Sequence, residues 1–319
     1  MHELKIEKND AGQRLDKFIT KALDIPMSLL YKSIRMKKIK VNRKRAEIST
    51  KLSEGDTVQC FLPDEFFTKK TEENSLARIK PQLDIIFEDE NIMLLNKRPG
   101  VSVHEDENGS TNTLITHIQA YLYQKGEYNP EAEQSFSPSL CNRIDRNTGG
   151  IVIAAKCAEA LRVMNEKIKL REIDKYYLAA VHGVPTPAEA TIRGYLIKDE
   201  RSNLVRVYDK NPPKGAKEII TKYRVIAKAK DTSLIEVELL TGRTHQIRAH
   251  MAHIGHPLVG DGKYGINKSD RAKGYKYQAL YSYKLRFSFK GEPSLLDYLN
   301  GKEFSIPKNE IYFTEEYFR

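Results

Sequence analysis

The residues best suited to chemistry surround one carboxylate, Asp145. It lies between Arg143 and Arg146, just before two glycines and a short apolar run at 151–155. Positive charges within a few ångströms favour the ionised form of a carboxylate, and glycines let a ligand or a neighbouring backbone come close. Such a carboxylate can act as a nucleophile or stabilise positive charge on a substrate. An ion pair that caps the junction between a loop and a strand explains the same residues, so this stretch alone leaves both interpretations open.

A second group of reactive side chains lies at 241–261. This segment directly follows a predicted strand, repeats apolar residues at helical spacing and ends at Gly255 and Pro257. The pattern predicts a helix with a threonine as a candidate N-cap. Half of the chain's eight histidines fall here, together with Arg243 and Arg248. The helix therefore presents a dense group of cationic and titratable side chains.

The histidines allow a metal site as an alternative. His250 and His253 lie three residues apart, on one face of the predicted helix, and Asp261 could add a carboxylate ligand. These residues would suit a metal-dependent hydrolase. The spacing does not match His-Glu-x-x-His, however, and the helix contains no glutamate that could act as a base. Because histidines on helices are commonly hydrogen-bonded structural residues, the pattern favours a structural role.

The elements that position these side chains are predicted to be mostly strands. The apolar run at 151–155 is typical of a buried strand. Further strands are predicted at 84–97, as a pair joined by an acidic turn, at 175–183, and in alternating runs within 190–209 and 217–240. Helices are predicted at 110–123, with Thr113 as N-cap, and at 159–170, and residues 124–138 are predicted to form a loop.

Residues 1–63 form a separate pattern. An amphipathic helix is predicted from about Gln13, a second helix from Ser28 as its N-cap, and strands at 39–42 and 55–61. Between positions 32 and 51 there are nine lysines or arginines against one acid. Seven of them lie on the predicted second helix and in the segment after it: Lys32, Arg35, Lys37, Lys38, Arg43, Lys44 and Arg45. Such a run of charge is by itself typical of a solvated surface. Polar residues 64–80 are predicted to be a linker to a second domain at 81–319.

Composition narrows the class of protein. The 319 residues carry 53 Lys and Arg against 43 Asp and Glu, a net charge of +10 that suggests an anionic partner such as nucleic acid. The three cysteines include no Cys-x-x-Cys pair, so they imply neither a disulfide framework nor a cysteine-rich zinc site. The chain shows no signal-peptide core and no apolar run long enough to span a bilayer. We expect a cytoplasmic protein without a membrane partner, acting as a monomer.

The N-terminal pattern resembles the S4-type RNA-binding domain. The order is Arg-Leu-Asp at 14–16, two helices, Lys-Ile-Lys-Val-Asn at 38–42 and Glu-Gly-Asp-Thr-Val at 54–58. This chain has Asn42-Arg43 where the family usually has Asn-Gly. The resemblance implies that the seven cations of the second helix and the segment after it are RNA contacts. They would hold RNA phosphates, which positions the protein without reading much sequence.

Three further segments resemble, in order and spacing, the signature motifs of the RluA-type pseudouridine synthases. They are Asn-Arg-Ile-Asp-Arg-Asn-Thr-Gly-Gly at 142–150, Lys-Tyr-Tyr-Leu-Ala at 175–179, and the segment 241–261 that begins Thr-Gly-Arg-Thr-His-Gln-Ile-Arg. The resemblance covers about 81–319. It implies an α+β catalytic domain built on a mixed, largely antiparallel central sheet with a cleft across its middle, and a small α/β domain of the S4 type before it. In such enzymes the bond from ribose carbon 1′ to the uracil nitrogen is cut, the base turns, and carbon 5 is joined instead, with no cofactor and no metal.

The resemblance also implies roles for individual residues. Asp145 is the catalytic carboxylate, Arg248 is its partner, and Tyr177 lies against the uracil, where it could take the proton from carbon 5. The sequence leaves open whether Asp145 attacks carbon 1′ or removes a ribose proton. Arg143 corresponds to an arginine that enters the space left by the flipped base. The other implied substrate contacts in this part of the chain are Arg146, Thr148, Arg243 and His245.

The first motif departs from the family pattern in three places. Asn142 replaces the usual His, Ile144 the usual Leu, and Gly149 the usual Ser. These changes leave the carboxylate and both flanking arginines in place. They concern the residues that position the loop, so the loop need not lie as it does in other members. We expect isomerisation of uridine to pseudouridine in structured RNA, chiefly RNA of the large ribosomal subunit. The alternative from another class is a non-catalytic RNA-binding or ribosome-assembly protein that keeps the fold.

Overall fold

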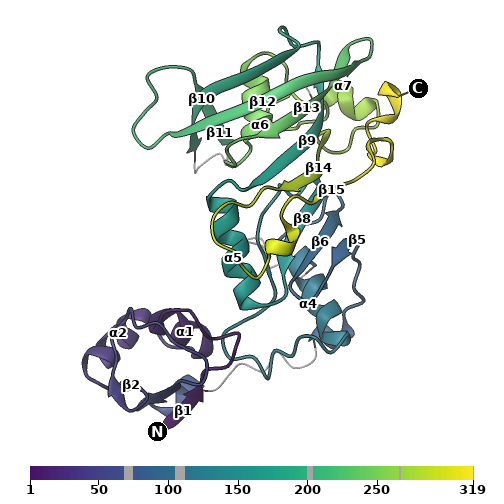
Figure 1. Ribbon diagram of the computed structural model, residues 1–319. Coiled ribbons are helices and arrows are strands. Elements are labelled where there is room, and N and C mark those ends of the chain that lie inside the picture. The colour runs from purple at the N-terminus through teal and green to yellow at the C-terminus, as the bar shows by residue number, and fades with distance from the viewer. Residues whose placement is uncertain (68–74, 105–111, 200–203, 266, 319) are drawn as a thin grey trace.

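The computed structural model describes residues 1–67, 75–104, 112–199, 204–265 and 267–318, which form an N-terminal module and a much larger second module (Figure 1). The N-terminal module contains β1 (His2–Lys5), α1 (Leu15–Ala22), α2 (Met27–Arg35), β2 (Ile39–Val41), β3 (Lys44–Arg45) and β4 (Thr57–Cys60). Its four strands form one antiparallel sheet in the order β1-β4-β2-β3. Leu15, Phe18, Leu30 and Val58 belong to a hydrophobic core of its own. The helices and strands predicted in this part are confirmed.

The start of the second helix differs from the prediction. Helix α2 begins at Met27, with Pro26 at the N-cap position and no side-chain capping bond, so the prediction of Ser28 as N-cap is wrong. Proline suits this place because its fixed φ is compatible with a helix start and its missing N–H would have no helical partner. The serine lies inside the first turn instead.

A tight hairpin turn joins β2 and β3. Its two residues, Asn42 and Arg43, have φ values of 50° and 64°. This left-handed pair is the geometry that Asn-Gly favours, because β-strand twist matches such a turn and glycine adopts it without strain. Arginine in the second position therefore carries a backbone cost and places a cation at the tip of the hairpin.

The second module is built on an eleven-stranded sheet. Along its main path the order is β11-β10-β12-β13-β9-β14-β8-β6-β5, while β15 pairs with β14 and β7 with β8. Only β8 and β14 run parallel among the strand pairs of the described residues. The expected mixed, largely antiparallel sheet is thus confirmed. The strands are β5 (Ile85–Glu88), β6 (Ile92–Lys97), β7 (Ser139–Leu140), β8 (Gly149–Ala155), β9 (Ile173–His182), β10 (Glu189–Asp199), β11 (Leu204–Tyr208), β12 (Lys217–Lys228), β13 (Thr232–Leu239), β14 (Leu280–Phe287) and β15 (Glu303–Ser305).

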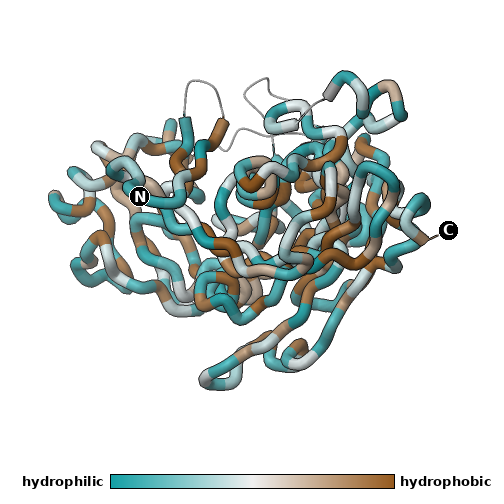
Figure 2. Tube along the Cα trace, turned by 90° about the horizontal axis from the view of Figure 1, so that it is seen from above, coloured by the Kyte–Doolittle hydropathy of each residue, from teal (hydrophilic) through white to brown (hydrophobic). Residues whose placement is uncertain are grey.

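Both faces of this sheet are covered, and strand β8 near its middle is apolar without a break. Along β8, all seven residues are buried, and alternate side chains belong to two separate hydrophobic cores. Ile151 and Ile153 face one core, while Val152 and Ala154 face the other, as the two-residue period of a strand requires. Figure 2 shows hydrophobic segments running through the interior of this module.

Different helices cover the two faces. Helix α5 (Ala158–Lys169) packs on one face together with C-terminal residues such as Phe313. Helices α4 (Leu114–Gln124) and α6 (Gln246–His253) contribute to the core on the other face. Thr113 accepts a hydrogen bond from the backbone N–H of Thr116 at 3.3 Å, which confirms it as the N-cap of α4. The remaining elements are α3 (Ser75–Arg78), α7 (Asn267–Ala272), η1 (Asp64–Phe67), η2 (Asp297–Leu299), η3 (Lys308–Glu310) and η4 (Glu315–Tyr317).

Hydrogen bonds dock the N-terminal module onto the second module. The carboxylate of Asp10, which is 1% exposed, accepts bonds from Ser135 Oγ at 2.5 Å and Gln134 Nε2 at 3.1 Å. Asn9 Nδ2 donates to Glu133 Oε1 at 2.8 Å. The partners lie within the predicted loop 124–138, of which Gln124 is the last residue of α4 and residues 125–138 contain no helix or strand. The predicted linker 64–80 includes η1 and α3, and its residues 68–74 lie outside the described residues.

Within the described part of the chain, no helix has the length and apolar character needed to cross a membrane.

Candidate active site

Asp145 lies in the loop between β7 and β8, at a pocket of about 580 Å³. Two bonds shape this loop: the N–H of Thr148 donates to the carbonyl of Asp145 at 3.0 Å, and Gln278 Nε2 donates to the Thr148 hydroxyl at 3.2 Å. At the other end, Asn142 Oδ1 accepts from the N–H of Ile153 at 2.7 Å. The asparagine that replaces the usual histidine thus bonds to β8 and holds the start of the loop against the sheet.

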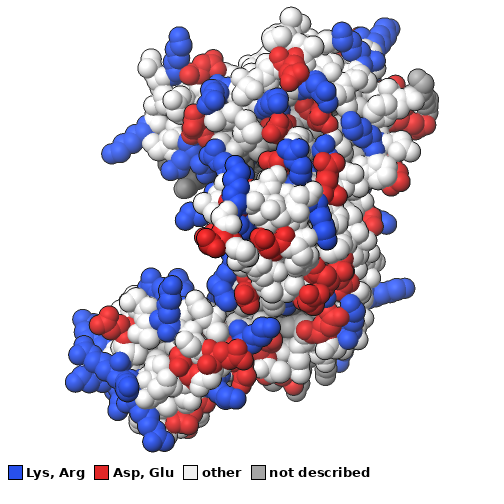
Figure 3. All heavy atoms as spheres, in the orientation of Figure 1, with Lys and Arg blue, Asp and Glu red and all other residues white. Residues whose placement is uncertain are grey.

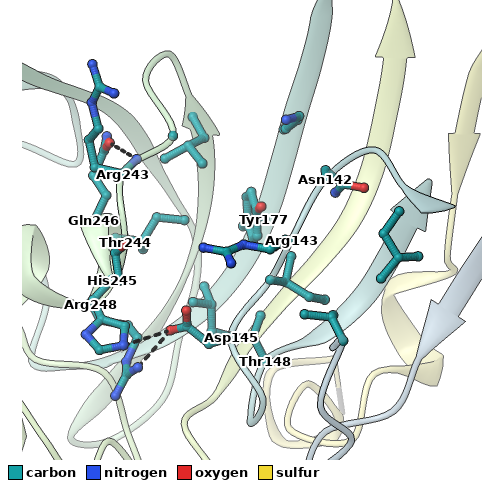
Figure 4. Close-up of a pocket in the computed structure, with 18 of the residues that line it drawn as sticks. Asn142, Arg143, Asp145, Thr148, Tyr177, Arg243, Thr244, His245, Gln246 and Arg248 are labelled. Atoms are coloured by element: carbon teal, nitrogen blue, oxygen red, sulfur yellow. Dashed lines mark hydrogen bonds and ion pairs between the residues drawn. The ribbon is translucent and has the colours of Figure 1, made fainter. Parts of the chain in front are cut away.

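Arg248 connects Asp145 to a second carboxylate. Its Nη1 donates to Asp145 Oδ2 at 2.7 Å, while its Nε and Nη2 bond both oxygens of Asp261 at 2.7 and 2.8 Å. The side chain of Asp261 is 0% exposed and that of Asp145 is 26% exposed. His245 Nε2 lies 3.8 Å from Asp145 Oδ2 (Figure 4). The guanidinium is therefore fixed by the buried carboxylate and presents one N–H to the exposed one.

The bonds between Arg248 and Asp261 favour the charged forms of these two groups. Burial alone would lower the pKa of Arg248, but its bonds to Asp261 and the charges of both carboxylates raise that pKa above its usual value. Burial would likewise raise the pKa of Asp261, and the bonds from Arg248 hold that pKa below its usual value. Burial lowers the pKa of His245, so this imidazole favours its neutral form. Arg248 thus stays cationic next to Asp145.

The flanking arginines do not pair with Asp145, contrary to the expectation from their position in sequence. Arg146 Nε donates to the carbonyl of Gly100 at 3.1 Å. Arg143 is exposed, lines the pocket and extends across it toward the segment of Thr244 and Gln246 (Figure 4). The partner of the carboxylate is instead Arg248, as the resemblance implied. Residues 145–148 form a turn closed by the bond from the Thr148 N–H to the Asp145 carbonyl, and within it Arg146 is directed to Gly100 and not to the carboxylate.

Tyr177 lies on β9 at the floor of the same pocket. Its ring is 6% exposed and packs in the hydrophobic core on that face of the sheet. Burial raises the pKa of Tyr177 to about 12, so the phenol keeps its proton at neutral pH. This protonated state favours the packing role against a base over the role of accepting a proton from carbon 5.

Helix α6 begins without a threonine cap, so that prediction is wrong. Its N-cap is His245, at φ 54°, with no side-chain capping bond. The Thr241 hydroxyl instead accepts from the N–H of Ile220 on β12 at 2.8 Å and donates to Gln246 Oε1 at 2.9 Å. The buried Gln246 also accepts from the N–H of Arg243 at 3.1 Å. These bonds fix the turn that leads to Arg248, while the exposed Arg243 side chain points away from Asp145 (Figure 4).

The two histidines considered as metal ligands have separate partners. His250 Nδ1 lies 3.0 Å from the Thr221 hydroxyl, and His253 Nε2 lies 2.9 Å from Asp209 Oδ1. Burial lowers the pKa of His250 to about 4, so it is neutral at physiological pH. The carboxylate of Asp261 already forms an ion pair with Arg248. Over the ranges that the structure describes, no three His, Cys, Asp or Glu side chains are arranged to hold a metal.

Sequence reasoning did not identify Lys97 as part of the site, and it considered Asp261 as a possible metal ligand and not as a partner of Arg248. Lys97 is 1% exposed, and its Nζ donates to the carbonyls of Arg98, Val101 and Arg146 at 3.1, 2.9 and 2.9 Å. It thereby ties the end of β6 to the loop that carries Asp145. Burial lowers the pKa of Lys97 to about 7. A lysine directly before Arg-Pro-Gly, at the end of a strand, was the available signal.

The predicted RNA contacts of the N-terminal module lie on its surface. Lys and Arg side chains gather over the end of this module that lies away from the second module in Figure 3. None of the seven predicted residues forms an ion pair with a described carboxylate. All seven are exposed: Lys32, Arg35, Lys37, Lys38, Arg43, Lys44 and Arg45. Exposed cations that form no ion pair are suited to bind the phosphates of a nucleic acid.

Comparisons with known proteins agree with this site. The family model described as RNA pseudouridylate synthase matches residues 91–253. Ribosomal large subunit pseudouridine synthase C of Vibrio vulnificus is 34% identical over 271 residues, which cover 83% of this chain and 80% of the relative. The protein of the same name from Buchnera aphidicola is 35% identical over 279 residues, covering 84% and 82%.

A solved structure supports the fold. The structure of human RNA pseudouridylate synthase domain containing 1 superposes with a TM-score of 0.57 at 22% identity, covering 75% of this chain and 87% of the other. The family match takes in the loop of Asp145, strand β9 and all of helix α6. The chain therefore belongs to the RNA pseudouridylate synthases, enzymes that isomerise uridine to pseudouridine in RNA.

Proposed function

We propose that the chain converts specific uridines of large-subunit ribosomal RNA to pseudouridine. The names of the relatives from Vibrio and Buchnera support this substrate. The pocket of about 580 Å³ is within the range of sites that enclose a small ligand, and a flipped nucleotide is of that kind. The exposed cations of the N-terminal module add a surface for structured RNA.

The observation that carries the proposal is the bond from Arg248 to Asp145 at the edge of the pocket. When the bond between carbon 1′ and the uracil nitrogen breaks, the sugar becomes electron-poor. The Asp145 carboxylate can stabilise or trap that centre, and the structure is compatible with attack on carbon 1′ and with removal of a ribose proton. Arg248 keeps the carboxylate oriented, since its own position is fixed by Asp261.

Tyr177 and Arg143 are assigned to the base and the space around it. The apolar ring of Tyr177 forms the floor on which uracil can lie while it turns. Arg143, exposed in the same pocket, can occupy the position that the flipped base leaves in the RNA. Thr148 acts indirectly, because its bonds shape the loop rather than line up a reactive group. Arg243 and His245 line the pocket and are assigned to RNA contact.

The N-terminal module is proposed to be an S4-type RNA-binding domain. Two helices on a small antiparallel sheet, a separate core and an exposed basic end support this assignment. The three cysteines are free thiols, which is compatible with the reducing cytoplasm. The proposal includes action there as a monomer, which sedimentation of the purified protein would test.

Tritium release from RNA labelled at carbon 5 of uridine tests the function. We expect the wild-type protein to release tritium from unmodified large-subunit ribosomal RNA, and Asp145→Asn to release none while it still binds this RNA. Absence of release with the wild-type protein would favour a non-catalytic RNA-binding protein. Release by the variant would refute the role of Asp145.

A further inference from the structure

We propose that a second cavity, which meets the uridine pocket at Asp145, binds phosphodiester groups next to the target nucleotide. The inference rests on the proposed function, because it names a further part of the same substrate. The cavity has a volume of about 440 Å³. Cationic side chains dominate its lining: Arg146, Arg248, Lys263, Arg271 and Lys276.

The two cavities share a wall. Asp145, His245 and Arg248 line both of them. A nucleotide that places its ribose at Asp145 must lead its backbone out of the first pocket at one side or the other. The second cavity opens beside the same carboxylate, so a phosphate attached to that ribose or to the next one can enter it.

The charge of the second cavity suits an anion. Its lining contains one carboxylate, Asp145, and that group is already bonded to Arg248. Arg146 and Lys276 are exposed and form no ion pair with any carboxylate in the described ranges. The Lys276 ammonium lies 5.5 Å from the centre of the Tyr277 ring. Phosphate oxygens could pair with Arg146 and Lys276, and arginine matches such oxygens with parallel N–H groups.

The structure holds these cations in place relative to Asp145. The backbone of Arg146 is fixed by bonds from Lys97 Nζ and the N–H of Gly100, both to its carbonyl at 2.9 Å. The segment of Lys276 is tied to the catalytic loop by the bond from Gln278 to Thr148. Both anchors end in the loop that carries Asp145, so the main chain on either side of the cavity is held next to the carboxylate. A main chain placed in this way loses less conformational freedom when a phosphate binds.

Substitution of Lys276 tests the proposal. Lys276→Gln removes one charge with little change in length, and Lys273→Gln is the matched control, since Lys273 is also exposed but does not line the cavity. Dissociation constants for unmodified large-subunit ribosomal RNA are measured by filter binding over a series of salt concentrations. The slope of the logarithm of the binding constant against the logarithm of the salt concentration should be smaller in magnitude for Lys276→Gln than for wild type. We expect a difference of about 0.7–0.9, the value for one lost phosphate contact. The control should keep the wild-type slope.

A second measurement locates the contact. The probe is a short RNA that contains one uridine modified by the wild-type protein, with a single methylphosphonate linkage placed in turn at each flanking phosphate. At one of these positions the neutral linkage should weaken binding to the wild-type protein and have no further effect on Lys276→Gln. Equal salt slopes for wild-type and Lys276→Gln, or an equal loss for both proteins at every linkage, would overturn the proposal. Tritium release by the wild-type protein in the same experiment shows that the proposed function stands even if this site does not.

Discussion

Arg248 joins a fully buried carboxylate to a partly exposed one, so neutralising each carboxylate should have a different effect. Asp261 accepts two bonds from Arg248 and further bonds from the N–H groups of Lys263 and Tyr264 at 2.9 and 3.2 Å. Asp261→Asn turns one acceptor into a donor that faces a buried guanidinium. We expect it to lower the free energy of unfolding by about 3–5 kcal/mol, the usual cost of removing one partner from a buried ion pair.

Asp145→Asn is the matched comparison. It removes one bond from a side chain that is 26% exposed, and Asp261 still balances the charge of Arg248. We expect a loss of about 1 kcal/mol in unfolding free energy but no tritium release. Asp261→Asn should release tritium slowly even where it is folded, because Arg248 loses its anchor. Urea denaturation and single-turnover assays at one temperature measure both effects.

The pH dependence gives an independent check. The pKa of Asp261 lies below its usual value in the folded protein, so its ionised form stabilises the fold above about pH 4, the range where the unfolded chain is also ionised. That stabilisation is lost as the pH falls through the lower folded pKa. The stabilities of wild type and Asp261→Asn should therefore approach each other in acid. If Asp261→Asn unfolds no more readily than Asp145→Asn at neutral pH, Asp261 is not the anchor of Arg248.

Three further predictions follow from single positions. Gly149→Ser restores the usual serine and should cost about 1–3 kcal/mol of unfolding free energy, because a Cβ there would lie 2.3 Å from the ring of Tyr281. In thermal melts, adding Tyr281→Leu should recover part of that loss. Unchanged stability of Gly149→Ser would show that the ring can move aside. Burial lowers the pKa of Lys97 to about 7, so the unfolded chain binds one more proton than the folded chain between about pH 7 and 10. The unfolding free energy should therefore rise there with pH, by up to about 1.4 kcal/mol per pH unit. Denaturant titrations of Lys97→Met should lack this rise, and a variant that keeps the wild-type pH dependence would contradict the prediction. Arg43→Gly should relieve about 1 kcal/mol of backbone strain while it weakens RNA binding in filter assays, and unaltered affinity would remove Arg43 from the RNA surface.

Local sequence patterns predicted the elements well because their signals lie within each element. The two apolar runs joined by an acidic turn in 84–97 predicted the antiparallel pair β5 and β6, and the apolar spacing at 159–170 predicted α5. Thr113 was recognised as an N-cap because it precedes the first apolar position of α4. The prediction of a threonine N-cap for α6 was wrong, because the Thr241 hydroxyl bonds to β12. The local sequence does not indicate where β12 lies.

The site was predictable only in part, because its bonds cross long stretches of chain. Resemblance indicated that Asp145 and Arg248 pair, and the structure joins them at 2.7 Å. Reasoning from neighbours alone favoured Arg143 and Arg146 as partners, which the loop geometry does not allow. The order of the central sheet also depends on contacts between distant segments: β14 lies between β9 and β8, although more than a hundred residues separate it from β8.

The two glycines after the loop that carries Asp145 fix the register of that loop on the sheet. A Cβ at Gly149 would meet the ring of Tyr281, and one at Gly150 would lie 2.1 Å from the carbonyl oxygen of Ser282. These residues form the parallel pairing of β8 with β14. A slip by one residue would bring Thr148 or Ile151 into a space that admits no side chain, so the end of the loop cannot shift along the sheet. Insertions or deletions that adapt the loop to another RNA must therefore be absorbed before Gly149, and every such variant would still enter β8 at the same point.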